Sequence, residues 1–584
     1  MSYSDQFFFV IDSIDLQNID NKLYGYIISR DQIIRETSDV RKTDLTGVGA
    51  YVYIENRGSE LRIYQDYSGS FGLYLYKKED YFAVSNSFVK LLDYVKKANI
   101  LSINQRYLDH YFASDYCTFA YEETAVQEIK SLDRAAAIII NKDKNGIEVV
   151  YHDYNENTID PCSAEGLSIL DKWYEKYTSL FRSIRRNSTN IQVDLSGGFD
   201  SRISYMLYYT SGADLSEIMI RSMNDGLHTH AEDYEIAQRI SGDAGVSLNH
   251  ALKESKLMPL ARDEIEEMSF DTKLFFHKQM YFNQGKYSVP LYHITGAGGE
   301  LIREYLAKDM NSFIEKELSR LDAFPAEYKT RFAAAHKETL ENTYDLVKKR
   351  RKPINDINTM IAFYRETGSR NHFGKQNAEK YQANIIRITP LLDPDLQQLE
   401  ISTEGCKDNS LLVALILDRY CPKMLEYPFE GGRSICQGTI DFVKEVNRKT
   451  PYYHSYQPNI SKAEESQGNV CNSVTSANDL HIEDSIKTAV CSKKMRDLFS
   501  RVYEESVYRQ VCERIEETSF HPLSDAFVVI AVCKLYDAIH NKDGADGISG
   551  FLNEVLHDKQ ETIPQRLWRS VKNRLAVKKA GQDN

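Results

Sequence analysis

The sequence contains few cysteines, and none of them form a recurring pattern. Its nine cysteines are scattered singly along 584 residues, without a CxxC or CxH pair. Zinc sites and redox motifs need closely spaced pairs, and small disulfide scaffolds need far more cysteine per residue. The scattered cysteines therefore exclude these classes and indicate reduced thiols.

Long apolar runs, a basic leader and excess positive charge are also missing. No apolar stretch approaches the roughly 18 residues of a membrane span, and Met1–Gln6 carries none of the positive charge that opens a signal peptide. Lysine and arginine total 72 against 85 aspartate and glutamate, a net charge of −13. This balance disfavours broad nucleic-acid binding. We expect a cytoplasmic protein that binds no nucleic acid.

One stretch organises the chain, running from Ile191 to Ser201 with the sequence IQVDLSGGFDS. Alternating apolar residues predict a short buried strand, which a Ser-Gly-Gly turn joins to a helix. Glycines let the backbone approach a phosphate closely, and the amides and dipole of a helix N-terminus favour an anion. The sequence therefore predicts an anion site formed by Leu195, Ser196, Gly197, Gly198, Asp200 and Ser201.

Asp200 needs a separate role, because a carboxylate repels phosphates. It is predicted to hold Mg²⁺, which would neutralise the phosphates of a nucleotide. No Gly-Lys-Ser/Thr follows the glycines, so this is not a Walker loop. The stretch resembles the pyrophosphate loop, Ser-Gly-Gly-x-Asp-Ser, of the ATP pyrophosphatases. The resemblance implies cleavage of ATP between its α- and β-phosphates; a plain structural turn is the alternative.

A second resemblance, to asparagine synthetases, covers nearly the whole chain but is tight only at residues 191–205. Residues 1–158 contain short strand-like runs, and Ile63–Asp66 and Leu73–Tyr76 are similar to that family's glutaminase half. The resemblance implies an α+β N-terminal antiparallel sandwich of the Ntn-hydrolase type. Ser2 stands where the glutaminase has its nucleophilic cysteine, and the supporting motifs are missing. We therefore expect a degenerate half without glutaminase activity.

Residues 159–560 are expected to form the synthetase domain. The resemblance implies an α/β fold with a parallel sheet, followed by a helical C-terminal part. Glu217–Ser222 predicts the second parallel strand, and in relatives the end of this strand lines the adenine pocket. Ile220 and Ser222 are therefore candidate nucleotide-binding residues.

Tyr292–Leu301 resembles the second synthetase signature, with one residue missing. Thr295 and Gly296 would keep the backbone close to the nucleotide. Glu300 is the acidic residue left in the turn, and we assign it as the second Mg²⁺ ligand. Ala297 replaces the side chain that relatives place beside the acyl group, so a general base must come from elsewhere. The alternative is a structural turn that has lost its nucleotide role.

Two further regions carry candidate cations. Arg365, Arg370, His372 and Lys375 precede a stretch that resembles the border of the family's acceptor pocket. They would suit an anionic substrate, or they are exposed helix charges. The family's lysine motif is replaced by Pro428–Ser434, in which Arg433 is the nearest cation and is assigned a catalytic role beside Asp200 and Glu300. Lys423 is the fallback.

Two C-terminal segments have distinctive compositions. Residues 455–485 are rich in serine, asparagine and glutamate and predict a long loop. The tail, residues 561–584, is basic, with apolar residues on one face. This pattern allows peripheral contact with a membrane surface, but it is more typical of a docking helix or a frayed tail.

The resemblances together imply an AMP-forming amide synthetase. A carboxylate of a small molecule or a sugar would attack ATP·Mg²⁺ to give an acyl-adenylate and pyrophosphate, and an amine or ammonia would then displace AMP. Relatives without glutaminase include β-lactam-forming and lasso-peptide-cyclising enzymes, and others amidate uronic acids of bacterial surface polysaccharides. The alternatives are a tRNA-modifying adenylase and a degenerate nucleotide-binding partner subunit. The oligomeric state stays open.

Overall fold

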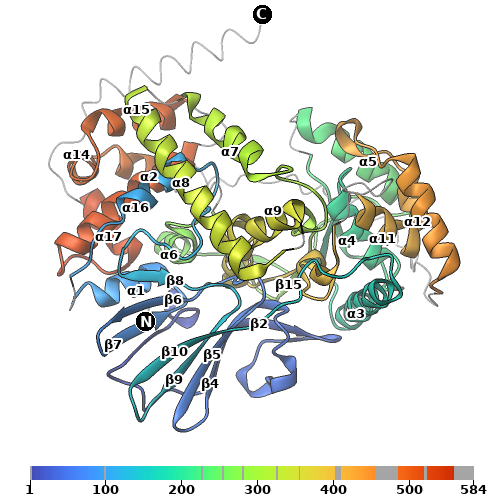
Figure 1. Ribbon diagram of the computed structural model, residues 1–584, viewed down its shortest axis with the longest axis horizontal. Coiled ribbons are helices and arrows are strands. Elements are labelled where there is room, and N and C mark those ends of the chain that lie inside the picture. Colours follow the sequence, from blue (N-terminus) through green and yellow to red (C-terminus); the bar gives the residue numbers. More distant parts are fainter. Residues whose placement is uncertain are drawn as a thin grey trace, which may run out of the picture.

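The protein combines an antiparallel β-region with a separate parallel sheet and many helices (Figure 1). The computed structural model describes residues 3–557, except 98–99, 225–227, 253–254, 279–281, 284, 324–325, 354, 402–409, 454–484 and 518–521. The basic tail, nearly all of the predicted loop and Ser2 lie outside the described residues. Within them, no helix is both long and apolar enough to cross a membrane.

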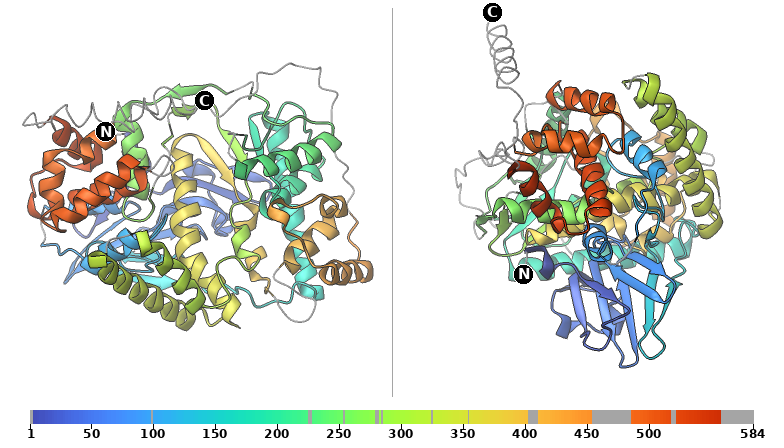
Figure 2. Two further views of the ribbon diagram at one scale, coloured as in Figure 1. Left: turned by 90° about the horizontal axis from the view of Figure 1, so that it is seen from above. Right: turned by 90° about the vertical axis from the view of Figure 1, so that its left-hand side faces the viewer.

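Two antiparallel sheets pack face to face near the N-terminus, and the predicted strand-like runs fall in these sheets. The first has the order β1 (Val10–Asp12), β7 (Tyr81–Ser85), β6 (Tyr74–Lys78), β8 (Ile129–Ser131). The second has the order β10 (Gly146–Tyr151), β9 (Ala136–Asn141), β5 (Glu60–Gln65), β4 (Gly49–Asn56), β2 (Lys22–Ser29), β3 (Gln32–Ile34). Alternate side chains of both sheets, among them Ile63 and Val84, fill one shared core. Figure 2 shows this sandwich below the helical body.

The second sheet-forming region holds four parallel strands in the order β12 (Met219–Arg221), β11 (Ile191–Asp194), β15 (Leu291–Ile294), β16 (Ile385–Ile388). Both predicted strands, 191–195 and 217–222, are therefore present and adjacent. Apolar side chains of β11 pack against α3 (Ala164–Asn187) and α11 (Leu411–Tyr420) in one large core. A two-stranded sheet, β13 (Leu257–Pro259) and β14 (Gly285–Tyr287), lies apart.

Helices make up most of the rest. They cover the parallel sheet on the right of Figure 1 and form a separate layer above the sandwich. The remaining helices are α1 (Phe88–Val95), α2 (Gln105–Ala113), α4 (Phe199–Tyr209), α5 (His228–Asp243), α6 (Arg262–Lys273), α7 (Met310–Ser319), α8 (Ala326–Arg351), α9 (Asp356–Tyr364), a π-helical segment (Arg365–Gly374), α10 (Lys375–Gln382), α12 (Gln437–Lys449), α14 (Lys493–Phe499), α15 (Glu505–Glu517), α16 (Pro522–His540) and α17 (Gly547–His557).

Early and late parts of the chain share one core. Phe88 of α1 and Phe112 of α2 belong to the same apolar cluster as Phe527 of α16 and Phe551 of α17. Asp93 of α1 accepts a hydrogen bond of 2.8 Å from Lys534 Nζ, which is fully buried. The N-terminal region and the C-terminal helices therefore form one packed body in space, although the chain passes through the parallel sheet between them.

Candidate functional site

Two turns that carry the predicted site residues meet at one edge of the parallel sheet. The Ser196–Ser201 turn follows β11, and the Thr295–Leu301 turn follows β15, which is the neighbouring parallel strand. Because the carboxyl ends of parallel strands lie at the same edge, both turns face the same space. This edge is where open α/β sheets bind their ligands.

The two turns touch so closely that glycine is required. A Cβ added to Gly296 would lie 2.4 Å from the backbone of Asp200 and Ser201. A Cβ added to Gly299 would lie 1.9 Å from Cγ of Asp200. The hydroxyl of Ser204, on α4, donates a hydrogen bond of 3.0 Å to the carbonyl of Thr295. The backbone of the second turn is therefore fixed against the first turn of α4.

The serines and glycines of the first turn form a tight polar loop. The hydroxyls of Ser196 and Ser201 lie 2.8 Å apart, and the amide of Gly198 donates to Ser196 Oγ over 3.1 Å. Gly198 is the residue before α4, whose first amides have no acceptor within the helix. The amide of Gly197 donates to Asp233 of α5 over 2.8 Å. A phosphate at this helix start would meet hydroxyls, backbone amides and a favourable dipole.

Asp200 and Glu300 form the acidic part of the site. Glu300 Oε2 is buried and has no hydrogen-bond partner among the described residues. Burial and the negative charge of Asp200 raise the pKa of Glu300 to about 7. Two carboxylates that repel each other beside an unsatisfied oxygen fit a divalent cation, and Mg²⁺ typically uses one or two carboxylates together with phosphate and water. No larger group of potential metal ligands occurs in the described residues.

Arg303 is a site residue that the sequence reasoning missed. It donates two hydrogen bonds to Asp200, from Nε to Oδ1 over 3.2 Å and from a terminal nitrogen to Oδ2 over 2.9 Å. It lies three residues beyond Glu300 in the sequence, but no motif there indicates its contact with Asp200.

The remaining nucleotide-binding candidates have backbone or core roles. Leu195 and Ile220 are buried, and the amide of Leu195 donates to the carbonyl of Arg221 over 2.9 Å. Ser222, at the end of β12, exchanges two 3.0 Å hydrogen bonds with the side chain of Asn249. These residues can position backbone next to a nucleotide base, and Asn249 fixes the end of β12.

Of the two candidates for the missing lysine, only Arg433 lies at the loop. Its guanidinium is 5.9 Å from the ring of Phe199 and forms an ion pair with Glu430. Lys423 instead pairs with Asp243 over 3.5 Å, and both side chains are about half exposed.

Arg202, which the sequence reasoning also missed, fastens the segment before Arg433 to the loop. This fully buried guanidinium donates to the carbonyls of Gly197, Met424 and Tyr427 over 3.0–3.1 Å and lies 3.9 Å from the ring of Phe429.

The cations proposed for an anionic substrate are used elsewhere. Arg365, Arg370 and Lys375 are each at most 2 % exposed, so the alternative of exposed helix charges is wrong. Arg370 donates to the hydroxyl of Ser131 over 2.9 Å, and Lys375 donates to Tyr74 over 2.7 Å. These contacts hold the π-helical segment and the start of α10 against the antiparallel sheets. Arg365 pairs with Glu156 over 3.1 Å, whereas the described partners of Arg370 and Lys375 are carbonyl and hydroxyl oxygens. The contacts account for the positions of all three cations without an anionic substrate.

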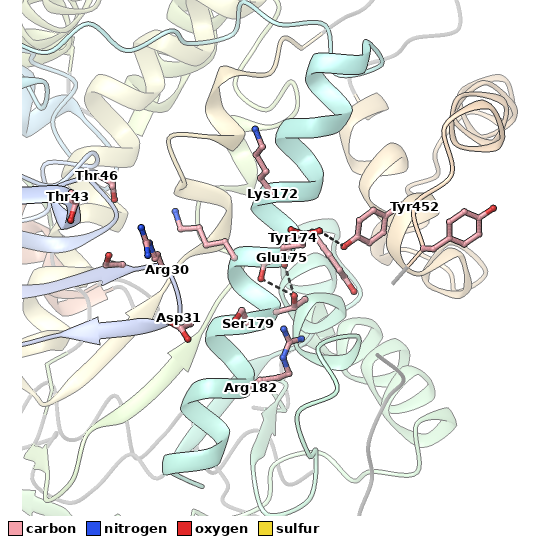
Figure 3. Close-up of a pocket in the computed structure, with 14 residues that line it drawn as sticks. Arg30, Asp31, Thr43, Thr46, Lys172, Tyr174, Glu175, Ser179, Arg182 and Tyr452 are labelled. Carbon is pink, nitrogen blue, oxygen red and sulfur yellow. Dashed lines mark hydrogen bonds between the residues drawn. The ribbon is translucent and has the colours of Figure 1, made fainter. Parts of the chain in front are cut away.

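A groove of about 800 Å³ lies between the β2–β3 hairpin and α3 (Figure 3). Its walls mix charged, hydroxyl and tyrosine side chains, including Arg30, Lys172 and Tyr452. None of its lining residues belongs to the turns after β11 or β15. This groove is therefore separate from the site at the sheet edge.

No family model matches the chain, and no curated protein is significantly similar to it. What the site can do therefore follows from its residues and their geometry.

Proposed function

We propose that the protein is an ATP-dependent amide synthetase. A substrate carboxylate attacks the α-phosphorus of ATP, the bond to the bridging oxygen of pyrophosphate breaks, and an acyl-adenylate forms. An amine or ammonia then attacks the acyl carbon, AMP leaves, and the amine loses a proton. A sugar acid of a bacterial surface polysaccharide is one acceptor class that fits this proposal.

The loop residues would act by positioning and by charge. The amides at the start of α4 and the hydroxyls of Ser196 and Ser201 would bind the phosphates. Asp200 and Glu300 would hold Mg²⁺, which when bound supplies neutralising charge to the phosphates. Arg433 would stabilise negative charge on the departing pyrophosphate.

One observation carries the proposal: the Asp200 carboxylate lies directly against Gly299, beside the unsatisfied carboxylate of Glu300. Arg303 pairs with Asp200, but Glu300 keeps a buried oxygen that has no hydrogen-bond partner among the described residues. A purely structural turn gains nothing from such an oxygen, because a carboxylate costs free energy when it loses water. An anion-binding helix start with a cation-binding pair beside it has the donor and acceptor groups that ATP·Mg²⁺ requires.

Hydroxylamine trapping tests the reaction. The protein is incubated with ATP, Mg²⁺, hydroxylamine and a pool of carboxylic acids that includes uronic acids. We expect hydroxamates, AMP and pyrophosphate in equal amounts. Asp200→Asn should lower the rate about 100-fold or more, whereas Arg448→Ala, at an exposed ion pair of α12, should leave it unchanged. ADP and phosphate as products would overturn the assignment.

Calorimetric titration of ATP tests the second ligand. Glu300→Gln should weaken ATP binding about tenfold in the presence of Mg²⁺ and leave binding without Mg²⁺ unchanged, because the amide keeps the shape but lacks the charge. If the variant retains the full magnesium dependence, Glu300 only stabilises its own turn.

A non-catalytic nucleotide-binding subunit is the second candidate. It is supported by the altered second signature and by Gly197 and Gly198, whose amides already have acceptors in Asp233 and Ser196. This candidate predicts that the protein binds ATP but releases no pyrophosphate with any of the carboxylic acids tested. Turnover in the hydroxylamine assay would exclude it.

A further inference from the structure

The ion pair between Arg303 and Asp200 occupies both oxygens of a carboxylate that the proposed function assigns to a metal. Nε and a terminal nitrogen of Arg303 each reach one oxygen, at 3.2 and 2.9 Å. This is the two-pronged geometry in which arginine binds carboxylates most strongly. The side chains of Arg303 and Asp200 are only 12 % and 22 % exposed. Water therefore screens the pair weakly.

The surroundings of Arg303 hold its guanidinium at the start of α4. Its central carbon lies 5.8 Å from the ring of Phe199 and 5.3 Å from the ring of Tyr305. Phe199 is the first residue of α4 and directly follows Gly198. The guanidinium is thus next to the helix start that would bind phosphates.

Arg303 and a divalent cation cannot share Asp200. Both would need the same oxygens, and two cations in a weakly screened site repel each other strongly. Glu300 has an oxygen without a hydrogen-bond partner among the described residues, so a metal would add to that side first and displace the guanidinium from Asp200. Once displaced, Arg303 would carry a largely buried charge without a partner, which is costly unless an anion arrives with the metal.

We propose that Arg303 changes its partner when ligands bind. It neutralises Asp200 in the ligand-free protein, and it binds the phosphates of ATP when a metal ion binds Asp200. This inference rests on the proposed function and names a further ATP-binding residue for it. Arg303 would thus add a second cation to the one that Arg433 supplies in the proposed function. The side chain of Arg433 is paired with Glu430 and is 47 % exposed, so the more buried Arg303 would be the less screened of the two.

The test uses the full chain and two ligands, with Mn²⁺ as the metal probe because its free ion is counted by electron paramagnetic resonance. Without nucleotide, Arg303→Met should bind Mn²⁺ about tenfold more tightly, because the competing cation is gone. The same variant should bind ATP·Mg²⁺ about tenfold more weakly, because the phosphates lose a charged donor. Arg303→Lys should fall between, as it keeps the charge without the paired donors.

The opposite signs of the two effects make the test specific. Arg448→Ala, on the exposed face of α12 and paired with Glu445, is the matched control and should change neither affinity. If both affinities of Arg303→Met fall, Arg303 has only a structural role and the inference is wrong; unchanged affinities refute it as well. If wild-type protein binds no ATP, the proposed function and this inference fail together. If wild type binds ATP·Mg²⁺ and only the Arg303 variants deviate from expectation, the proposed function stands.

Discussion

At the scale of single residues, Gly299 controls how closely Asp200 and Glu300, the carboxylates proposed to hold Mg²⁺, can approach each other. The Asp200 side chain fills the space that any side chain at position 299 would need, since a Cβ added there would lie 1.9 Å from Cγ of Asp200. The glycine in one turn thereby sets the rotamer of the aspartate in the other. The conformation of Asp200 therefore depends on both turns together and cannot be inferred from the sequence of either turn alone.

Gly299→Ala should abolish most of the activity while the protein stays folded. The added methyl group must push the Asp200 carboxylate away from Glu300, and misplacement by about 1 Å costs about 100-fold in turnover. Pyrophosphate release and ATP·Mg²⁺ binding measure the loss. Gly242→Ala in α5 is the matched control, because its added Cβ would meet nothing within 4 Å. It should keep full activity and gain about 0.5–1 kcal/mol of stability. Equal losses in both variants would count against this role of Gly299.

The site could be predicted from sequence only where one motif contained it. The hydroxyls of Ser196 and Ser201 lie together because they share a turn, and Asp200 and Glu300 follow from two strand-to-helix signatures. Arg303 and Asp200 are 103 residues apart in the chain. Their contact depends on the distance between the second turn and α4. The one-residue deletion in the second signature changes that distance. The hydrophobic periodicity of the sequence does not predict the distance between the two turns.

At the scale of elements, Arg202 links α4 to the segment that brings Arg433 to the site. One buried guanidinium serves four backbone carbonyls, of Gly197, Met424, Tyr427 and Pro428. A backbone carbonyl that is buried without a donor costs about 1–3 kcal/mol. Arg202 therefore supplies most of the hydrogen bonds between the loop and the segment from Met424 to Phe429, beside the ring contact of Phe429 with Phe199.

Arg202→Leu should detach this segment and destabilise the protein by about 2–4 kcal/mol, because leucine fills part of the space but donates no hydrogen bond. Urea unfolding measures the loss, and limited proteolysis should show new cleavage between residues 424 and 433. Arg448→Leu on the exposed face of α12 is the control, since Arg448 pairs with Glu445 within its own helix. An unchanged cleavage pattern in Arg202→Leu would show that other contacts hold the segment.

Helices and strands were predictable where their buried residues recur at a regular spacing in the sequence. Strands of the sandwich such as β5 alternate between more and less buried residues, and the long helix α3 repeats its apolar residues at helical spacing. The π-helical segment was predicted less well. Its arginines look like solvated charges in the sequence, because the partners that bury them lie on β8 and on the loops of the sandwich, more than 200 residues earlier.

At the scale of the whole molecule, buried ion pairs join the sandwich to the helical body. Glu156 pairs with Arg134 of the sandwich region and, over 3.1 Å, with Arg365 of the π-helical segment. Burial alone would raise the pKa of Glu156, but Arg134, Arg365 and Arg351 outweigh it and lower that pKa to about 2. Because the folded pKa is below the unfolded value of 4.5, this carboxylate stabilises the protein above pH 4.5, and the contribution is lost as the pH falls toward 2.

Glu156→Gln should cost about 3–5 kcal/mol at pH 7, since it leaves buried arginines without their counter-charge. The variant should also lose less stability than wild type between pH 4.5 and pH 3. Urea unfolding across this range measures both effects. Glu445→Gln, at an exposed ion pair, should follow the wild-type curve. Parallel curves for Glu156→Gln and wild type would place the acid sensitivity elsewhere.

The sandwich should release no glutamate from glutamine. Ser2 is a weak substitute for an N-terminal thiolate, and the supporting motifs of the glutaminase are missing. A coupled glutamate assay on the purified protein, with Ser2→Ala as the control, measures this activity. Steady glutamate release that disappears in Ser2→Ala would contradict the expectation.

The core shared by α1, α2, α16 and α17 has a consequence for how the protein is made. Phe88 and Phe112 leave the ribosome long before Phe527 and Phe551, their partners in that core. At about 5–20 residues per second, the interval is on the order of tens of seconds. Throughout it, the apolar faces that α1 and α2 turn toward the late helices have nothing to cover them, so the nascent chain should depend on chaperones. For the same reason, a chain that ends before α14, and so lacks the late helices, should aggregate, whereas the full chain should stay in solution.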